Sequence, residues 1–352
     1  MILEVRGWRL EVKKEYIWTC QSGNEKVAQV ELKRKDRSFE LVNVLDNGVY
    51  LSKTDLTISE LVDRIQTTPM VFIRHVCKVD MIIGRCIGLE EIVDAVYGLA
   101  LTSLDKNLSY TVQIRVVNNG TLKKEKMELC DLLNQRLDDD GYVLNVKHCQ
   151  QIISIFIDKS QYYIGISPAG HNLSIHAGGM RHYAKDSGIV SRAAYKLMEA
   201  VEVFDIPMKS SWIALDLGAS PGGWSKVLLD KGMQVTAIDP GLMDEAIRKH
   251  PNLKHYQETT QKFIERKMHR KYQLIVNDMK INANDSIDLT NEFASFLDDQ
   301  GYVIMTLKLP QTFDYRFIKT LLARVNHTYQ LIHARQLFHN RSEITVVLKK
   351  RK

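Results

Sequence analysis

The feature that most constrains this chain is a glycine-rich turn that directly follows a short apolar run. Residues 214–225 read ALDLGASPGGWS, which predicts a buried strand, a tight turn and the start of a helix. A second apolar run over residues 234–238 ends in Asp239. Glycines let a ligand approach the backbone closely, and an acid at the end of the next strand can accept hydrogen bonds from ribose hydroxyls. The pattern therefore predicts a site for a nucleotide-type cofactor.

The order of the glycines distinguishes between cofactors. A dinucleotide pyrophosphate site requires G-x-G-x-x-G, whereas this loop reads G-x-x-x-G-G with a proline inside it. This order excludes NAD and favours a cofactor without a pyrophosphate, with S-adenosylmethionine as the first candidate. A plain strand–turn–helix connection is the simpler interpretation of the loop alone, but Asp239 weighs against it. The residues that we expect to bind the cofactor are Gly218, Ser220, Pro221, Gly222, Gly223, Trp224 and Asp239.

Length and composition indicate a globular protein of two or three domains. The 352 residues are 45% hydrophobic and 26% charged. No apolar run reaches the length of about 18 residues that a membrane span needs, so we expect no membrane partner. The first residues lack the basic and then apolar order of a signal peptide, which predicts a cytoplasmic protein. The five cysteines form no C-x-x-C pair, which indicates reduced thiols and no zinc site.

The net charge of +6 favours a polyanionic partner such as RNA. Basic residues gather at 33–35, 123–126, 262–270 and 349–352. Each cluster alone indicates little, because a run of charges is usually a solvated face.

The first half of the chain predicts two small domains. Residues 1–57 predict a β-rich domain with a tight turn at Asn47-Gly48 and strands at 16–20, 27–33, 39–44 and 50–51. Residues 58–166 predict an α+β domain, with helices at 58–66, 89–101 and 124–137 and strands at 71–79, 110–117, 143–146, 152–157 and 162–166.

Residues 167–352 predict a third domain that opens with a linker at 167–190. His171, His176 and His182 lie in this linker, but their spacing fits no metal site, and we expect no metal. Predicted helices at 191–204, 223–231, 244–249, 259–267, 289–297 and 315–325 alternate with strands at 212–217, 234–238, 274–277, 302–307, 329–333 and 344–348. This alternation predicts an α/β fold with a mostly parallel, doubly wound sheet. Such sheets bind ligands beyond the carboxyl ends of their strands, at the switch point.

Four charged residues stand near that predicted edge. Asp278 and Lys308 each follow a strand, Glu343 opens the last strand, and Lys196 lies in the helix before the first strand. Surface exposure is the simpler interpretation of Lys196 and Glu343, and a helix N-cap is the simpler one for Asp278. Lys308 is harder to explain in this way, because it ends an apolar strand and is followed at once by Leu309 and a proline.

These four residues resemble the Lys-Asp-Lys-Glu tetrad of the FtsJ-like RNA ribose 2′-O-methyltransferases. The resemblance is closest to the RlmM branch, which modifies large-subunit ribosomal RNA. The segments that carry it are SRAAYKL at 191–197, DLGASPGGW at 216–224, NDM at 277–279, LKLP at 307–310 and ARQLFHNRSE at 334–343. The resemblance implies a Rossmann-like methyltransferase domain from residue 167 onward that uses S-adenosylmethionine. It also implies a THUMP RNA-binding domain before it, which residues 58–166 would form.

The resemblance assigns the catalytic role to Lys196, Asp278, Lys308 and Glu343, and a place in the cofactor site to Asp278 as well. A lysine removes a proton from a ribose hydroxyl only when its amine is neutral. Burial and a second cation both favour the neutral amine, and Lys196 is the expected second cation.

Two positions depart from the pattern of the RlmM branch. Ser220 stands where the branch usually has cysteine, which is a mild steric change. Thr259 stands where the branch has an acid that contacts the adenine amino group. Either Thr259 or Glu258 before it is expected to take that contact.

Two other functions remain as alternatives. RNA-base N-methyltransferases also carry THUMP-type domains, but they have Asn/Asp-Pro-Pro-Tyr/Phe where this chain reads NDMK at 277–280. A non-catalytic RNA-binding or ribosome assembly factor on a methyltransferase scaffold stays open because of Thr259, although the complete tetrad argues against it.

Overall fold

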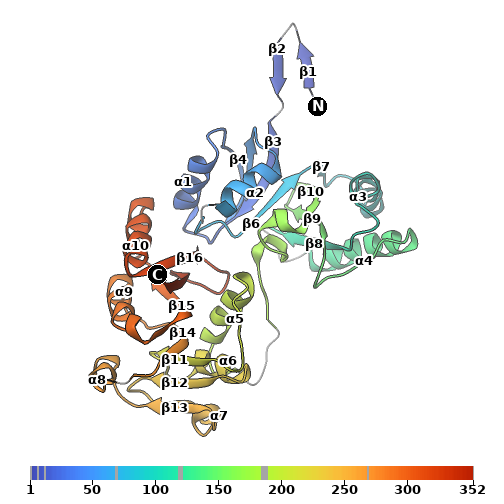
Figure 1. Ribbon diagram of the computed structural model, residues 1–352. Coiled ribbons are helices and arrows are strands. Elements are labelled where there is room, and N and C mark those ends of the chain that lie inside the picture. Colours follow the sequence, from blue (N-terminus) through green and yellow to red (C-terminus); the bar gives the residue numbers. More distant parts are fainter. Residues whose placement is uncertain are drawn as a thin grey trace. The chain divides into compact units, whose positions relative to one another are not determined.

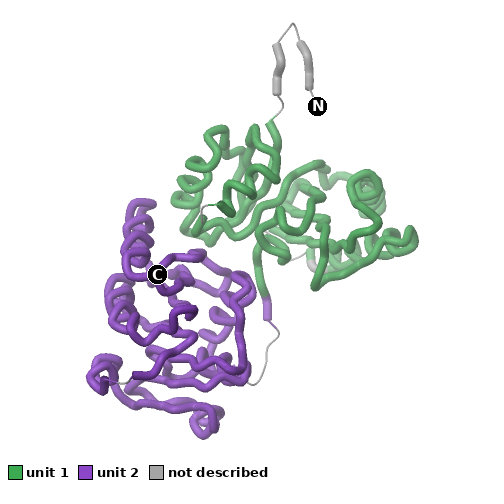
Figure 2. Tube along the Cα trace, viewed as in Figure 1, with its two compact units in different colours: residues 1–181 green, residues 182–352 purple. Residues whose placement is uncertain are grey.

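The chain forms two compact units, Met1–Arg181 and His182–Lys352. The computed structural model describes residues 2–5, 8–11, 13–67, 70–117, 122–183, 189–267 and 269–351. Figure 1 labels the elements, and Figure 2 colours the two units. None of the described helices is long and apolar enough to cross a membrane.

The first unit contains an antiparallel sheet with the strand order β4-β5-β3-β6. Before it, β1 (Ile2–Val5) pairs with β2 (Trp8–Glu11). The elements of the sheet and its two helices are β3 (Lys14–Thr19), α1 (Glu25–Lys35), β4 (Glu40–Asp46), β5 (Val49–Thr54), α2 (Ile58–Thr67) and β6 (His75–Val79).

A second sheet of the first unit has the order β7-β10-β9-β8, with β8 and β9 parallel. Its helices α3 and α4 pack on each other and share an apolar core with the strands. The elements are β7 (Met81–Gly84), α3 (Leu89–Ser103), β8 (Tyr110–Val116), α4 (Lys123–Asp139), β9 (Gln151–Ile157) and β10 (Gln161–Pro168), followed by the short turns η2 (Ala169–Asn172) and η3 (Ala177–Gly179).

Three predictions for the first unit need correction. Residues 27–33 form part of helix α1, because the buried side chains Val27, Ala28, Glu31 and Leu32 recur at the spacing of a helix face and not at every second residue. Residues 143–146 form no strand and make only an isolated bridge, between Leu144 and Tyr110. The expected boundary at residue 57 falls inside one sheet, because β6 pairs with β3.

The first part of the expected linker packs within the first unit. Asn172 is buried and donates a hydrogen bond to Ser167 Oγ. Thr19 Oγ1 and Arg115 Nη1 both donate to the carbonyl oxygen of Gly178, at 2.9 and 3.1 Å. These contacts explain why the first unit ends at Arg181 and not near residue 166.

The second unit contains a seven-stranded sheet in the order β13-β12-β11-β14-β15-β17-β16. The strands are parallel except β17, which is antiparallel to both of its neighbours. This confirms the expected α/β fold. Its elements are α5 (Ala193–Val203), β11 (Ile213–Leu217), α6 (Gly223–Asp230), β12 (Gln234–Ile238), α7 (Glu245–Arg248), β13 (Leu253–Tyr256), α8 (Thr260–Glu265), β14 (Tyr272–Asn277), α9 (Ala283–Glu292), η4 (Ala294–Phe296), β15 (Leu297–Lys308), α10 (Tyr315–Thr328), β16 (Tyr329–Arg335) and β17 (Glu343–Lys350).

Helices cover both faces of this sheet. Val276 packs in a buried cluster with Leu197 of α5 and Leu228 of α6. The next residue, Asn277, donates hydrogen bonds to Ser286 and Thr290 of α9. Successive side chains of a strand point to opposite faces, so α5 and α6 cover one face and α9 covers the other.

Four strands, β1, β2, β7 and β13, were not predicted from the sequence. Each has four residues and lies at the edge of its sheet. Four residues are too few for a clear alternation of apolar and polar side chains. An edge strand also pairs along one side only, so its sequence is less constrained to alternate.

Gly165 allows β10 to pass close to β6. A Cβ atom at this position would lie 1.8 Å from the carbonyl oxygen of Lys78. We expect Gly165→Ala to lower the free energy of unfolding of the chain by about 1–3 kcal/mol, the usual cost of overpacking. Gly98→Ala is the matched control, because a Cβ atom there meets nothing within 4 Å. It lies inside α3 and should stabilise the chain by about 0.5–1 kcal/mol. Urea unfolding measures both, and equal effects of the two substitutions would contradict the close approach.

Candidate active site

The site lies where the chain reverses its direction of travel across the sheet. From β11 the chain moves outward to β12 and β13, and then returns to β14 on the other side of β11. The loops after β11 and β14 therefore leave the same edge in opposite directions, which is the arrangement of a ligand site in a doubly wound sheet. The glycine-rich loop follows β11, and Asp278 follows β14.

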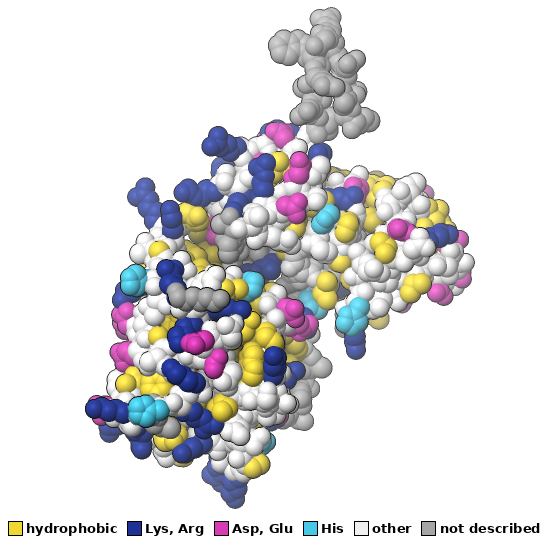
Figure 3. Space-filling model, viewed as in Figure 1, with side chains coloured by type: hydrophobic (Ala, Val, Ile, Leu, Met, Phe, Trp, Pro, Cys, Tyr) yellow, Lys and Arg dark blue, Asp and Glu magenta, His cyan; other side chains and the backbone are white. Residues whose placement is uncertain are grey.

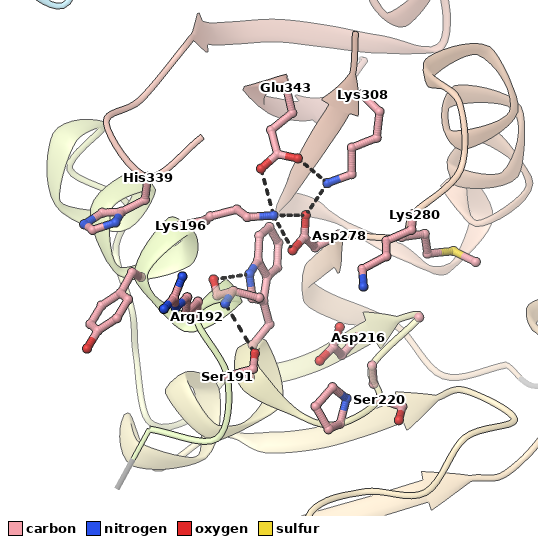
Figure 4. A pocket seen from close by; sticks show the side chains of 18 of the residues that line it. Ser191, Arg192, Lys196, Asp216, Ser220, Asp278, Lys280, Lys308, His339 and Glu343 are labelled. Atoms are coloured by element: carbon pink, nitrogen blue, oxygen red, sulfur yellow. Dashed lines mark hydrogen bonds and ion pairs between the residues drawn. The ribbon is translucent and has the colours of Figure 1, made fainter. Parts of the chain in front are cut away.

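Lys196, Asp278, Lys308 and Glu343 form a closed ring of ion pairs at this edge (Figure 4). Lys196 Nζ lies 2.9 Å from both oxygens of Asp278 and 2.8 Å from Glu343 Oε1. Lys308 Nζ lies 2.9 Å from Asp278 Oδ1 and 2.5 Å from Glu343 Oε2. The structure thus brings together the four charged residues that the sequence singled out.

The fold explains this meeting of distant residues. Lys308 ends β15 and Glu343 begins β17, and the two are direct partners in the antiparallel register. Asp278 follows Asn277, whose partner on β15 is Met305. Lys196 comes from α5, which covers the same end of the sheet. Because β17 runs antiparallel, its first residue reaches the edge at which the parallel strands end.

The ring balances two ammonium groups against two carboxylates in a largely buried place. The exposed fractions of the four side chains lie between 8% for Glu343 and 21% for Lys308. Burial by itself lowers the pKa of Lys196, but the carboxylates of Asp278 and Glu343 outweigh it and raise the pKa above its usual value. Lys196 therefore stays protonated and positively charged beside Lys308.

Thr306 belongs to the same group, although the sequence analysis missed it. Its hydroxyl donates to Asp278 Oδ1 at 2.6 Å and accepts from Lys308 Nζ at 3.0 Å. Thr306 precedes Lys308 by two positions on β15, so both side chains project from the same face of the strand. That spacing was the signal that would have identified it.

The loop after β11 needs glycine at two positions. Gly218 and Gly222 have φ values of +73° and +111°, which other residues rarely adopt. A Cβ atom on Gly218 would lie 2.3 Å from Met279 Cγ, and one on Gly222 would lie 2.3 Å from Ile247 Cδ1. The glycines therefore fix the path of the loop beside Met279, directly after Asp278.

Asp216 lies under this loop with its side chain buried. Burial raises its pKa to about 7, while the Ser225 hydroxyl, which donates to it at 2.6 Å, opposes that rise. The negative charges of Asp278 and Asp239 raise the pKa further. A positively charged ligand would favour the ionised carboxylate for the same electrostatic reason.

A cavity of about 910 Å³ connects the loop with the ring. This volume lies at the upper end of the range of roughly 300–1,000 Å³ for ligand pockets. The predicted site residues that line it are Lys196, Gly218, Ser220, Pro221, Gly223, Trp224, Asp239, Asp278, Lys308 and Glu343. Asp216, Arg192, Tyr195, Lys280, Phe338, His339 and Arg341 also line it and were not predicted.

Three predicted cofactor residues do not line the cavity: Gly222, Glu258 and Thr259. Gly222 shapes the loop as the N-cap of α6. Glu258 binds both Arg266 Nε and Nη2, at 2.6 and 2.9 Å. Thr259 is the N-cap of α8, and its hydroxyl oxygen accepts from Lys262 N. A helix cap thus accounts for Thr259.

Glu199 on α5 is a further residue that the sequence analysis missed. Its buried carboxylate accepts hydrogen bonds from the backbone amides of Phe338 and His339, both at 2.8 Å. The same helix carries Lys196 one turn earlier. Helix α5 therefore supplies one member of the ring and holds the segment that leads to another member, Glu343.

Comparison with known proteins finds similarity to RNA-modifying methyltransferases. Residues 189–313 match the family model described as FtsJ-like methyltransferase. The Ribosomal RNA large subunit methyltransferase M of Idiomarina loihiensis is 32% identical over 209 residues, which cover 55% of each chain. Proteins of the same name from Shewanella frigidimarina and Erwinia tasmaniensis are each 27% identical, over 94% of this chain and 95% of theirs.

Removal of the Glu199 carboxylate should destabilise the chain. Glu199→Ala leaves two backbone amides without their acceptor, at about 1–3 kcal/mol each, so we expect the free energy of unfolding to fall by about 2–6 kcal/mol. Glu202→Ala is the matched control on the exposed side of the same helix and should change stability by less than about 0.5 kcal/mol. Urea denaturation compares the two variants, and similar midpoints would show that Glu199 does not anchor the segment.

Proposed function

Because this chain carries an FtsJ-like methyltransferase domain, we propose that it transfers the methyl group of S-adenosylmethionine to a ribose 2′-hydroxyl of RNA. The observation that carries the proposal is the ring of Lys196, Asp278, Lys308 and Glu343 at the floor of the cavity. A ribose hydroxyl is a poor nucleophile and must lose its proton as the methyl group arrives. The ring supplies an amine that can take this proton and acceptors that hold the amine in place.

The cavity suits the cofactor on its chemistry. Gly218 and Gly223 of the loop after β11 line one wall without side chains that would fill it, and Asp239, which directly follows β12, is the proposed acceptor for ribose hydroxyls. Asp216 and Asp278 add negative charge on the same wall, which matches a sulfonium and an ammonium group. When bound, S-adenosylmethionine supplies an activated methyl group. Gly218, Ser220, Pro221 and Asp239 would hold it.

Lys308 is the proposed base. Its Nζ lies between Asp278 and Glu343, whose oxygens fix the direction of the amine. With the amine neutral, Nζ accepts the hydroxyl proton and becomes an ammonium that both carboxylates stabilise. Lys196 supplies the second cation of the ring and contacts the same two carboxylates as Lys308. Thr306 holds Asp278 and Lys308 together and is a positioning residue.

Large-subunit ribosomal RNA is the proposed substrate. The curated relatives that align along 94% of the chain are named as methyltransferases of that RNA. The net charge of +6 suits a polyanion, and Figure 3 shows Lys and Arg side chains on the visible faces of both units. We assign RNA recruitment to the first unit, which contains the THUMP-like residues 58–166 and whose helix α1 carries Lys33, Arg34 and Lys35 in its last turn.

The structure bears differently on the two alternative functions, base N-methylation and non-catalytic RNA binding. An RNA-base N-methyltransferase has an aromatic side chain after β14 that holds the planar amine of the base. In this chain Asp278 is followed there by Met279 and Lys280. A non-catalytic RNA-binding factor is favoured by one observation, since Glu258 and Thr259 are engaged by Arg266 and by the cap of α8 and do not line the cavity. The experiments below separate that role from catalysis.

The cofactor assignment predicts a selective loss of affinity. S-adenosylmethionine should bind, whereas NAD should not. Asp239→Ala should weaken binding by about 1–3 kcal/mol, the cost of a lost charge-assisted hydrogen bond. Asp239→Asn is a matched control for folding, because it retains an oxygen that can accept the hydrogen bond from Gly241 N. If titration calorimetry gives equal affinities for wild type and Asp239→Ala, Asp239 does not contact the cofactor.

The base assignment predicts a loss of rate without a loss of cofactor. Lys308→Ala should bind S-adenosylmethionine normally and methylate RNA about 10²–10⁴-fold more slowly in single-turnover experiments. Lys308→Arg should not restore the rate, since arginine keeps its proton. The wild-type rate should rise with pH, as expected for a reaction that needs an unprotonated base, and neither variant should show this rise. Near-normal rates for Lys308→Arg would mean that a fixed charge suffices.

A further inference from the structure

The cavity has a second wall that the cofactor and the ring do not use. Tyr195, Phe338 and His339 line it together with Arg192 and Arg341. Figure 4 shows His339 and Arg192 at the left of the view and Asp216 and Ser220 at its lower right. This wall carries aromatic rings and arginines, whereas the wall proposed for the cofactor carries the glycine-rich loop and carboxylates.

The rings on this wall form an ordered platform. The Tyr195 and His339 rings are stacked, with centroids 5.2 Å apart and planes 24° apart. Tyr183 stacks on Tyr195 at 5.3 Å and 8°, and Phe338 meets His339 edge to face at 5.1 Å. Tyr195 and His339 are both partly exposed and line the cavity.

The platform is positioned by the same elements that position the ring of charges. Tyr195 directly precedes Lys196 on α5. His339 lies in the segment that the buried Glu199 holds by its backbone, four residues before Glu343. The distance between platform and ring is therefore fixed by a rigid helix and an anchored segment.

A purely structural role would be to clamp α5 to the segment at 336–342. Glu199 already makes that connection through two hydrogen bonds. A clamp also has no need to line the cavity, nor to be flanked by two exposed arginines, Arg192 and Arg341. Partly exposed stacked rings beside arginines are the chemistry that binds an unstacked base and its phosphates.

We propose that Tyr195 and His339 stack on the base of the target nucleotide, while Arg192 and Arg341 contact the phosphates beside it. The inference rests on the proposed function and adds the substrate subsite to it. The base is attached to the ribose carbon next to the one that carries the 2′-hydroxyl. When that hydroxyl reaches Lys308, the base must therefore lie immediately beside the ring of charges.

The platform replaces an interaction that the substrate loses. A hydroxyl inside a regular RNA helix cannot enter a cavity next to buried lysines, so the target nucleotide has to leave its stack. Stacking on Tyr195 and His339 offsets that cost and holds the ribose in one orientation. The target is accordingly a nucleotide in a loop or another single-stranded segment.

The test compares two enzymes on two RNA fragments in single-turnover methylation. The intact fragment is unmethylated and contains the target nucleotide. Wild type and Tyr195→Ala each receive the intact fragment and a fragment whose target nucleotide keeps its ribose but lacks its base. Removal of the base should slow wild type about 5- to 150-fold at sub-saturating RNA, the equivalent of one lost aromatic stack. Tyr195→Ala should lose a similar factor on intact RNA and nothing more on the abasic fragment.

Phe204→Ala is the matched control. Phe204 follows the same helix and also stacks on a histidine, His333, at 4.8 Å, but it does not line the cavity. It should methylate intact RNA at the wild-type rate. If wild type methylates the two fragments at equal rates, the inference is wrong. It is also wrong if removal of the base slows Tyr195→Ala by the same factor as it slows wild type. Absence of methylation of the intact fragment by wild type would instead refute the proposed function.

Discussion

Two lysines and two carboxylates neutralise one another at the edge of the sheet, and the chemistry of the second unit depends on their remaining together. Each charge of the ring is largely buried and contacts two opposite charges. Loss of one member leaves another without full compensation, and an unpaired buried charge typically costs about 3–5 kcal/mol. The ring therefore constrains α5, β14, β15 and β17 to meet at one place. That place also borders the proposed cofactor wall and the aromatic platform.

The antiparallel strand β17 is the topological device that makes this meeting possible. In a fully parallel sheet the first residue of the last strand would lie at the opposite edge from Lys308. Because β17 runs the other way, Glu343 is the register partner of Lys308. The segment before β17 then passes over α5, where Glu199 fixes it. One helix and one reversed strand thus place the proposed base, the acceptors and the proposed base-stacking wall around a single cavity.

Much of this arrangement could be predicted from the sequence, because periodicity and strand ends are local signals. The alternation of the second unit, the loop at Gly218 and the charged residues at strand ends follow from such signals. Glu199 was missed because its role arises from contacts across the fold, whereas Thr306 was missed although its spacing from Lys308 is a local signal. Residues 27–33 of helix α1 were predicted as a strand because Ala28, Val30 and Leu32 alternate with polar residues, although Val30 is exposed in the structure. Glu258 and Thr259 were assigned to the cofactor site through a resemblance. In the structure, Glu258 binds Arg266 and Thr259 caps helix α8.

The central claim is that the ring directs the methyl group to a ribose oxygen of RNA. Mapping of ribose methylation in ribosomal RNA from cells with and without this protein tests it most directly, because a methylated 2′-hydroxyl protects the adjacent phosphodiester from alkaline cleavage. We expect one protected position in large-subunit RNA that disappears without the protein and stays absent when only the Lys308→Ala variant is supplied. An unchanged protection pattern, or a lost methyl group that lies on a base, would contradict it.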